Sequence, residues 1–191
     1  MWRNTQAGYG LAAQVLHWLI ALLFACQLAL GYLTQASADD PALQFRLYQW
    51  HKSLGFLILA LALLRLGWWA IGIRPAPAGH MGRLERLAAY AAHSLLLGLT
   101  IVVPLAGWAV VSASPLAIPS YAFDLVVIPN LPLAASDAAE AFWSRVHALL
   151  AYGTGLLALG HALAALHHHF LRRDDTLRRM VRPFRKHAGW K

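Results

Sequence analysis

Four long apolar runs, separated by shorter polar stretches, dominate the pattern of this chain. They cover residues 11–33, 51–73, 87–111 and 142–170. Each run reaches the about 20 residues that a helix needs to cross the hydrocarbon core of a bilayer. Pro104 lies inside the third run and predicts a kink there. The pattern therefore predicts an all-α fold, an integral membrane four-helix bundle.

Composition supports the membrane interpretation. The 191 residues are 59% hydrophobic and 13% charged, whereas a soluble domain of this size carries about 25% charged residues. The net charge of +8 does not indicate nucleic-acid binding, because the basic residues lie at the ends of apolar runs and form no stripe on a soluble surface. We expect residues 1–191 to form a single transmembrane domain in contact with lipid, ending in a basic tail over residues 171–191.

The charges between the runs predict the orientation. The connection over residues 112–141 contains three acidic residues and no lysine or arginine, and the connection around 37–46 contains two acidic residues and one arginine. Arginines gather instead in the second connection and in the tail. Because basic residues mark the cytoplasmic side, both termini are expected in the cytoplasm. The run Leu125–Ile128 is too short to span, and is either a cap on the outer surface or a loosely packed loop.

Histidines within the apolar runs are the main candidates for chemistry. His147 and His161 are fourteen residues apart, so both project from nearly the same helix face with a rise of about 21 Å. In the predicted topology His51 lies at the depth of His147 near the outer side, and His17 at the depth of His161 near the cytoplasmic side.

Ionisable residues inside a membrane mark functional sites, and this separation suits two haems stacked across the bilayer. Two b haems, one held by His51 with His147 and one by His17 with His161, would use all four side chains as axial ligands to the metal. The chain has no CxxCH motif, so haem would be bound non-covalently. The alternative is four unrelated hydrogen bonds between helices.

Other polar residues near these runs allow two interpretations each. His93 would serve a haem propionate or a quinone, or bond to a neighbouring helix. Arg65 would pair with a propionate or extend to the interface. Lys52 and Arg145 would make the outer entrance positive, or anchor helix ends. The run 167–169 is a metal tract or a polar cap at the inner interface.

Small residues accompany the histidines in the second and fourth runs. They are Gly55, Gly153, Gly155 and Gly160. Glycine lets a backbone approach a flat cofactor closely, and it equally allows tight packing between helices.

The ordered set of these motifs resembles bacterial cytochrome b561. The matching elements are His17-Trp18, the segment from His51 to Gly55, Arg65-Leu66, His93, the segment from Pro104 to Trp108, His147 and His161. The ending, from His161 through His168-His169-Phe170 to Asp175-Thr-Leu-Arg-Arg-Met180, resembles the superoxide oxidase branch of that family.

The resemblance implies a di-haem cytochrome b domain in the bacterial inner membrane, with ubiquinone as a redox partner. In the superoxide oxidase branch, superoxide is oxidised at the outer face and electrons pass to quinone. Lys52 and Arg145 would then attract superoxide, and His93 would serve the quinone on the inner side. Two function classes follow: a superoxide:ubiquinone oxidoreductase, or an electron-transfer subunit that serves a periplasmic, dehydrogenase or hydrogenase partner without its own substrate chemistry.

Overall fold

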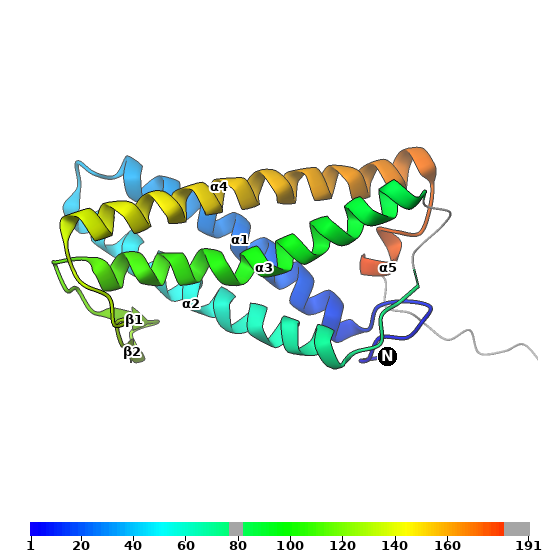
Figure 1. The fold of residues 1–191 in the computed structure, drawn as a ribbon, viewed down its shortest axis with the longest axis horizontal. Helices are drawn as coiled ribbons and strands as arrows, with labels where there is room; N and C mark the ends of the chain where they lie inside the picture. Colours follow the sequence, from blue (N-terminus) through cyan, green and yellow to red (C-terminus); the bar gives the residue numbers. More distant parts are fainter. Residues whose placement is uncertain (77–81, 182–191) are drawn as a thin grey trace, which may run out of the picture.

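A computed structural model describes residues 1–76 and 82–181. Four long helices run side by side along the molecule (Figure 1). They are α1 (Leu11–Ala36), α2 (Pro41–Ile71), α3 (Arg83–Ala113) and α4 (Asp137–His167). Each is long and apolar enough to cross a membrane. The prediction of a helical bundle with four candidate membrane spans is therefore confirmed.

Capping residues start two helices before their apolar runs begin. α2 begins at Pro41 because the Asp40 side chain accepts a hydrogen bond from the Leu43 amide (3.0 Å). α4 begins at Asp137 because the Ser136 hydroxyl accepts one from the Ala139 amide (3.1 Å). Most of the first connection, predicted around residues 37–46, is thus part of α2. The apolar pattern does not predict this segment, because the first turns of α2 are rich in polar residues.

The helices pack in chain order, α1 on α2, α2 on α3 and α3 on α4. The buried core comes mainly from α1, α2 and α3; its apolar members are Leu16, Ile20, Phe24, Ile58, Ala62, Val103, Ala106, Ala109 and Ala113. Thr154 is the one buried residue of α4. α4 packs chiefly against α3 and makes a smaller contact with α1.

One end of the bundle carries a small β-hairpin, and we call it the hairpin end. Strands β1 (Ser120–Ala122) and β2 (Val126–Ile128) pair antiparallel beside α2 and α3 (Figure 1). The buried Ser53 hydroxyl donates to the Tyr121 carbonyl and accepts from the Phe123 amide, both at 3.0 Å. The Trp108 indole donates to the Pro129 carbonyl (3.0 Å). This connection is therefore an ordered cap tied to the bundle, not a loosely packed loop.

The opposite end, which we call the terminal end, gathers the N-terminal segment and the chain after α4. A π-helical turn, η1 (His168–Arg172), is followed by the short helix α5 (Arg178–Val181) near the N-terminus (Figure 1). The Ala76 amide donates to the Gln6 carbonyl (2.9 Å), and the Arg179 guanidinium donates to the Ala76 carbonyl (2.8 Å). Three chain segments thus close this end together. Residues 182–191 of the predicted basic tail lie outside the described residues.

Candidate haem sites

Two pairs of histidines face each other across the bundle. At the hairpin end the rings of His51 on α2 and His147 on α4 have centres 6.0 Å apart and planes at 88°. Toward the terminal end the rings of His17 on α1 and His161 on α4 have centres 6.3 Å apart and planes at 80°. All four side chains are half-buried. The structure brings together the same pairs that the matched depths predict.

The spacing of both pairs fits a metal ion between the rings. A metal-bound imidazole nitrogen lies about 2 Å from the metal, and the ring centre lies about 1.1 Å farther away. Two imidazoles on opposite sides of one iron therefore have centres about 6 Å apart. His93 is different, because its ring centre is only 5.0 Å from that of His161. The residues present thus fit two bis-histidine haems, with His93 as a neighbour of one ligand.

His147 is oriented by α3. Its Nδ1 lies 3.0 Å from the Val103 carbonyl oxygen, which requires Nδ1 to carry the proton and leaves the Nε2 lone pair free for a metal. One turn later on the same face, a Cβ added at Gly107 would lie 3.0 Å from Cε1 of His147. The missing side chain of Gly107 therefore makes room for the imidazole.

His51 lies against α1. A Cβ added at Gly31 would lie 3.3 Å from Cε1 of His51. The Gln27 amide, 9% exposed, donates to the His51 carbonyl oxygen (2.8 Å). Nδ1 of His51 and Oε1 of Gln27 are both buried and have no hydrogen-bond partner among the described residues. α1 thus supplies both the space and a polar side chain for this histidine.

The glycines that touch the ligand rings are not those singled out from the sequence. A Cβ at Gly55 would approach the Gln27 amide (3.3 Å), and one at Gly155 would approach the Leu28 side chain (2.9 Å), which supports helix packing as their role. Gly153 and Gly160 face open space. Gly107, inside the segment from Pro104 to Trp108, was the available signal that sequence reasoning did not use.

Arg65 lies close enough to interact electrostatically with the histidines of the terminal-end site. It is half-buried, and no carboxylate within the described residues forms an ion pair with it. An arginine in such a position needs an anion, and a haem propionate fits that need. Burial raises the pKa of the neighbouring Tyr9 phenol, although Arg65 and Arg179 act in the opposite direction. Tyr9 is thus a neutral phenol near Arg65.

The predicted outer cations differ in their surroundings. The Lys52 ammonium donates to the Pro119 carbonyl oxygen (3.1 Å), which ties it to the hairpin connection next to His51. Arg145 is exposed on α4. Because it is two residues from His147, it projects from nearly the opposite side of that helix. Of the two cations, Lys52 is therefore the one held beside a histidine of the pair, whereas Arg145 points away from His147.

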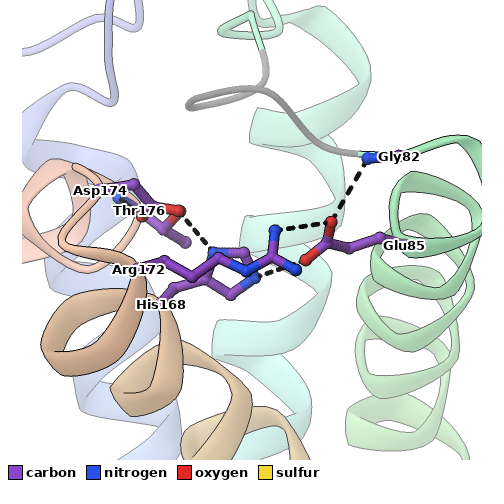
Figure 2. A network of polar contacts seen from close by, with 6 residues as sticks. All are labelled: Gly82, Glu85, His168, Arg172, Asp174 and Thr176. Carbon is purple, nitrogen blue, oxygen red and sulfur yellow. Dashed lines mark hydrogen bonds and ion pairs between the residues drawn. The ribbon is translucent and has the colours of Figure 1, made fainter.

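The three consecutive histidines at the end of α4 have separate environments. His168 is buried between Glu85 and Asp174 (Figure 2). The His169 ring packs against Phe170, and His167 is exposed. Within residues 1–76 and 82–181, no group of three or more ligand-type side chains is arranged to hold a metal ion. This arrangement supports the interpretation of a polar cap.

A membrane bundle whose helices bring histidines together in opposed pairs defines a class of protein, the membrane-bound b-type cytochromes. Within that class the chain belongs to the prokaryotic cytochrome b561 family, which it matches over residues 8–183. It is similar to cytochrome b561 homolog 2 of Escherichia coli (strain K12), with 30% identity over 178 residues that make up 93% of each chain. The protein is therefore a haem-binding, multi-pass membrane protein of electron transfer, and the resemblance to bacterial cytochrome b561 is confirmed.

Proposed function

We propose that the protein carries two b haems per chain and moves electrons from superoxide at the hairpin end to ubiquinone near the terminal end. The observation that carries this proposal is the pair of opposed histidine sites, joined by α4 and separated by about 21 Å along it. When bound, the haems supply one-electron carriers at two depths. Their ligands are His51 with His147, and His17 with His161.

The reaction balances as two one-electron oxidations coupled to one two-electron reduction. Two superoxide anions each lose an electron and leave as O₂. One ubiquinone gains those two electrons and two protons and leaves as ubiquinol. Two redox centres suit this stoichiometry, because a one-electron donor must deliver twice before a two-electron acceptor is reduced.

The chain's own side chains have distinct roles in this proposal. The Val103 carbonyl fixes the His147 tautomer, and Arg65 neutralises a propionate of the terminal-end haem. His93, whose ring contacts that of His161, donates a hydrogen bond to ubiquinone beside the terminal-end haem. Lys52 presents positive charge beside His51, where superoxide would approach.

The charge distribution supports an orientation with the hairpin end outward. Acidic residues lie in the connections at the hairpin end, namely Asp39, Asp40, Asp124, Asp137 and Glu140. Arginines cluster at the terminal end, in the second connection and after α4. Basic residues mark the cytoplasmic side of a membrane protein. Superoxide would therefore be oxidised at the outer face of the bacterial inner membrane, and ubiquinone would be reduced in the cytoplasmic half of that membrane.

A pyridine haemochrome assay of the purified protein tests the two-haem assignment. The wild type should bind two haems per chain, and His51→Ala or His147→Ala should bind one. His17→Ala or His161→Ala should lose the other. His167→Ala, on the same helix but exposed, is the matched control and should retain both. One haem in the wild type contradicts the proposal.

Turnover of the isolated chain separates the enzyme from an electron-transfer subunit. Under a calibrated superoxide flux, the purified protein with a soluble ubiquinone analogue should form one ubiquinol for every two superoxide anions consumed. Haem reduction without ubiquinol formation, or no reaction with superoxide, would instead favour a cytochrome subunit that depends on a partner.

A further inference from the structure

The chain after α4 turns back across the terminal end, and we call residues 168–181 the strap. The turn uses two uncommon backbone features, the π-helical residues of η1 and a left-handed Arg173 (φ 55°). A non-glycine residue in the left-handed region costs about 1 kcal/mol or more, and persists where surrounding contacts enforce it. The strap makes such contacts at both of its ends.

The first end of the strap is fixed to α3 through His168. Its Nε2 lies 3.1 Å from Oε1 of Glu85, and its Nδ1 lies 2.5 Å from Oδ2 of Asp174 (Figure 2). The other oxygen of Glu85 accepts from Arg172 (3.1 Å), and the other oxygen of Asp174 accepts from the Thr176 amide (2.9 Å). His168 is 9% exposed. Together these contacts stabilise the turn by which the chain reverses direction after α4.

The second end of the strap is fixed to α1 through backbone carbonyls. The Trp18 indole donates to the Met180 carbonyl oxygen, and the Gln14 amide donates to the Arg179 carbonyl oxygen, both at 2.9 Å. Gln14 is 4% exposed. The Trp18 side chain is 46% exposed, so its bond to the strap restricts a position that packing alone leaves open.

The Trp18 indole in turn lies against His17. The two ring centres are 5.2 Å apart with planes at 71°, an edge-to-face contact. Nδ1 of His17 is buried with no hydrogen-bond partner among the described residues, unlike Nδ1 of His147, which has the Val103 carbonyl. The indole, held by its bond to Met180, is therefore a neighbour that limits rotation of the His17 ring.

We propose that the strap is a positioning element for His17. Held to α3 by His168 and Glu85, it anchors the Trp18 indole through the Met180 carbonyl, and the indole sets the plane of the His17 ring toward His161. The inference rests on the proposed role of His17 as a ligand of the terminal-end haem. Trp18 and His168 act on that centre only through other residues, so they are positioning residues.

Trp18→Phe tests the anchor directly, because it keeps an aromatic edge beside His17 and removes the N–H donor. We expect a changed low-spin electron paramagnetic resonance signal and a changed midpoint potential for the terminal-end haem, with the hairpin-end haem unaltered. Trp108→Phe is the matched control, since it removes an indole bond to a carbonyl at the other end of the bundle. It should leave the terminal-end signal unchanged. The single-haem variants of His51 and His17 assign the two signals.

His168→Ala tests the fixed end of the strap, with the exposed His167→Ala as its control. Hydrogen exchange in the strap should rise in His168→Ala only, and the terminal-end signal should change as it does in Trp18→Phe. An unchanged signal in Trp18→Phe, or in His168→Ala with a demonstrably loosened strap, overturns the inference. Exchange is measured without reference to haem, so a failure of the two-haem assignment would be recognised separately by the haemochrome assay.

Discussion

At the scale of single residues, the space around a ring decides how a histidine can be held. Gly107 and Val103 lie one turn apart on α3 and together define the position of His147 through a van der Waals contact and a hydrogen bond. A methyl group at Gly107 would lie 3.0 Å from Cε1 and 3.2 Å from Nδ1 of His147. Either the ring or the helix must then move.

Gly107→Ala should therefore weaken the hairpin-end haem selectively. We expect at least a partial loss of one haem per chain in the haemochrome assay and a shifted signal for what remains. Gly98→Ala is the matched control, because Gly98 lies about two and a half turns away on the opposite face of α3 and a Cβ there meets nothing within 4 Å. Equal haem content and equal spectra in both variants would refute the role given to Gly107.

Asp174 gives the strap a dependence on pH. Desolvation raises the pKa of its carboxyl, but hydrogen bonds from Thr176 and His168 outweigh this, and the pKa lies below the ordinary 3.8. Because the folded pKa is lowered, the stabilisation is fully present above about pH 4 and is lost as the pH falls through the folded pKa. The protection factors for hydrogen exchange of residues 168–176, which correct for the intrinsic pH dependence of amide exchange, should fall on acidification over that range.

Two substitutions check this dependence on pH. Asp174→Asn should lower the protection factors of the strap at neutral pH and make them nearly independent of acidification. Asp175→Asn is the matched control, because that carboxylate is 63% exposed and lies 3.5 Å from Arg178. It should preserve the wild-type profile. A strap in Asp174→Asn that responds to acid as the wild type does would exclude Asp174 as the group responsible.

At the scale of elements, the hairpin connection depends on one buried hydroxyl of α2. Ser53 is 4% exposed, and its hydroxyl bonds to the backbone of Tyr121 and Phe123, the residues on either side of Ala122 at the end of β1. Ser53→Ala should lower the free energy of unfolding by about 1–2 kcal/mol and speed proteolysis within residues 114–136. Ser94→Ala, at an exposed position of α3, should do neither. Unchanged proteolysis in Ser53→Ala would mean that other contacts hold the hairpin.

The same element shows where sequence reasoning reaches its limit. The four spans follow from apolar runs, because each must satisfy its backbone within a helix. The histidine pairs follow from helical periodicity and depth. The hairpin does not, since its strands are three residues long and are held by Ser53, 68 residues away from Tyr121. The contacts of Gly31 and Gly107 depend on the rotation of each helix, which periodicity in these evenly apolar spans leaves undetermined.

At the scale of the whole molecule, the unequal charge of the two ends predicts the topology. A reporter fused after Lys191 should be active in the cytoplasm, and one inserted near Asp124, at the exposed tip of the hairpin, should be active outside. The physical reason is the cytoplasmic preference of arginine-rich connections. The reverse pattern would exchange the faces assigned to superoxide and ubiquinone and would leave the histidine pairing intact.

The last prediction concerns how an anionic substrate reaches an end that is acidic overall. The carboxylates at the hairpin end repel superoxide at long range, so local cations must offset them beside His51 and His147. Lys52 is adjacent to His51 and held there by Pro119. Arg145 is exposed on α4, two residues before His147 in sequence, and adds positive charge at the same end. A positive entrance raises the association rate of an anion about tenfold or more, and salt screens that gain.

Lys52→Glu combined with Arg145→Glu should therefore slow the reduction of the haems by superoxide about tenfold at low ionic strength. The double variant should also lose the wild-type decrease of that rate with added salt, while its haem spectrum stays the same. Arg83→Glu combined with Arg86→Glu makes the same change in net charge at the terminal end and should react like the wild type, because the effect is local to the entrance. If both double variants are slowed equally, the whole field of the protein governs the encounter and Lys52 and Arg145 have no special place in it. If neither is slowed, superoxide is not steered by charge, and its access depends on the shape of the hairpin end alone.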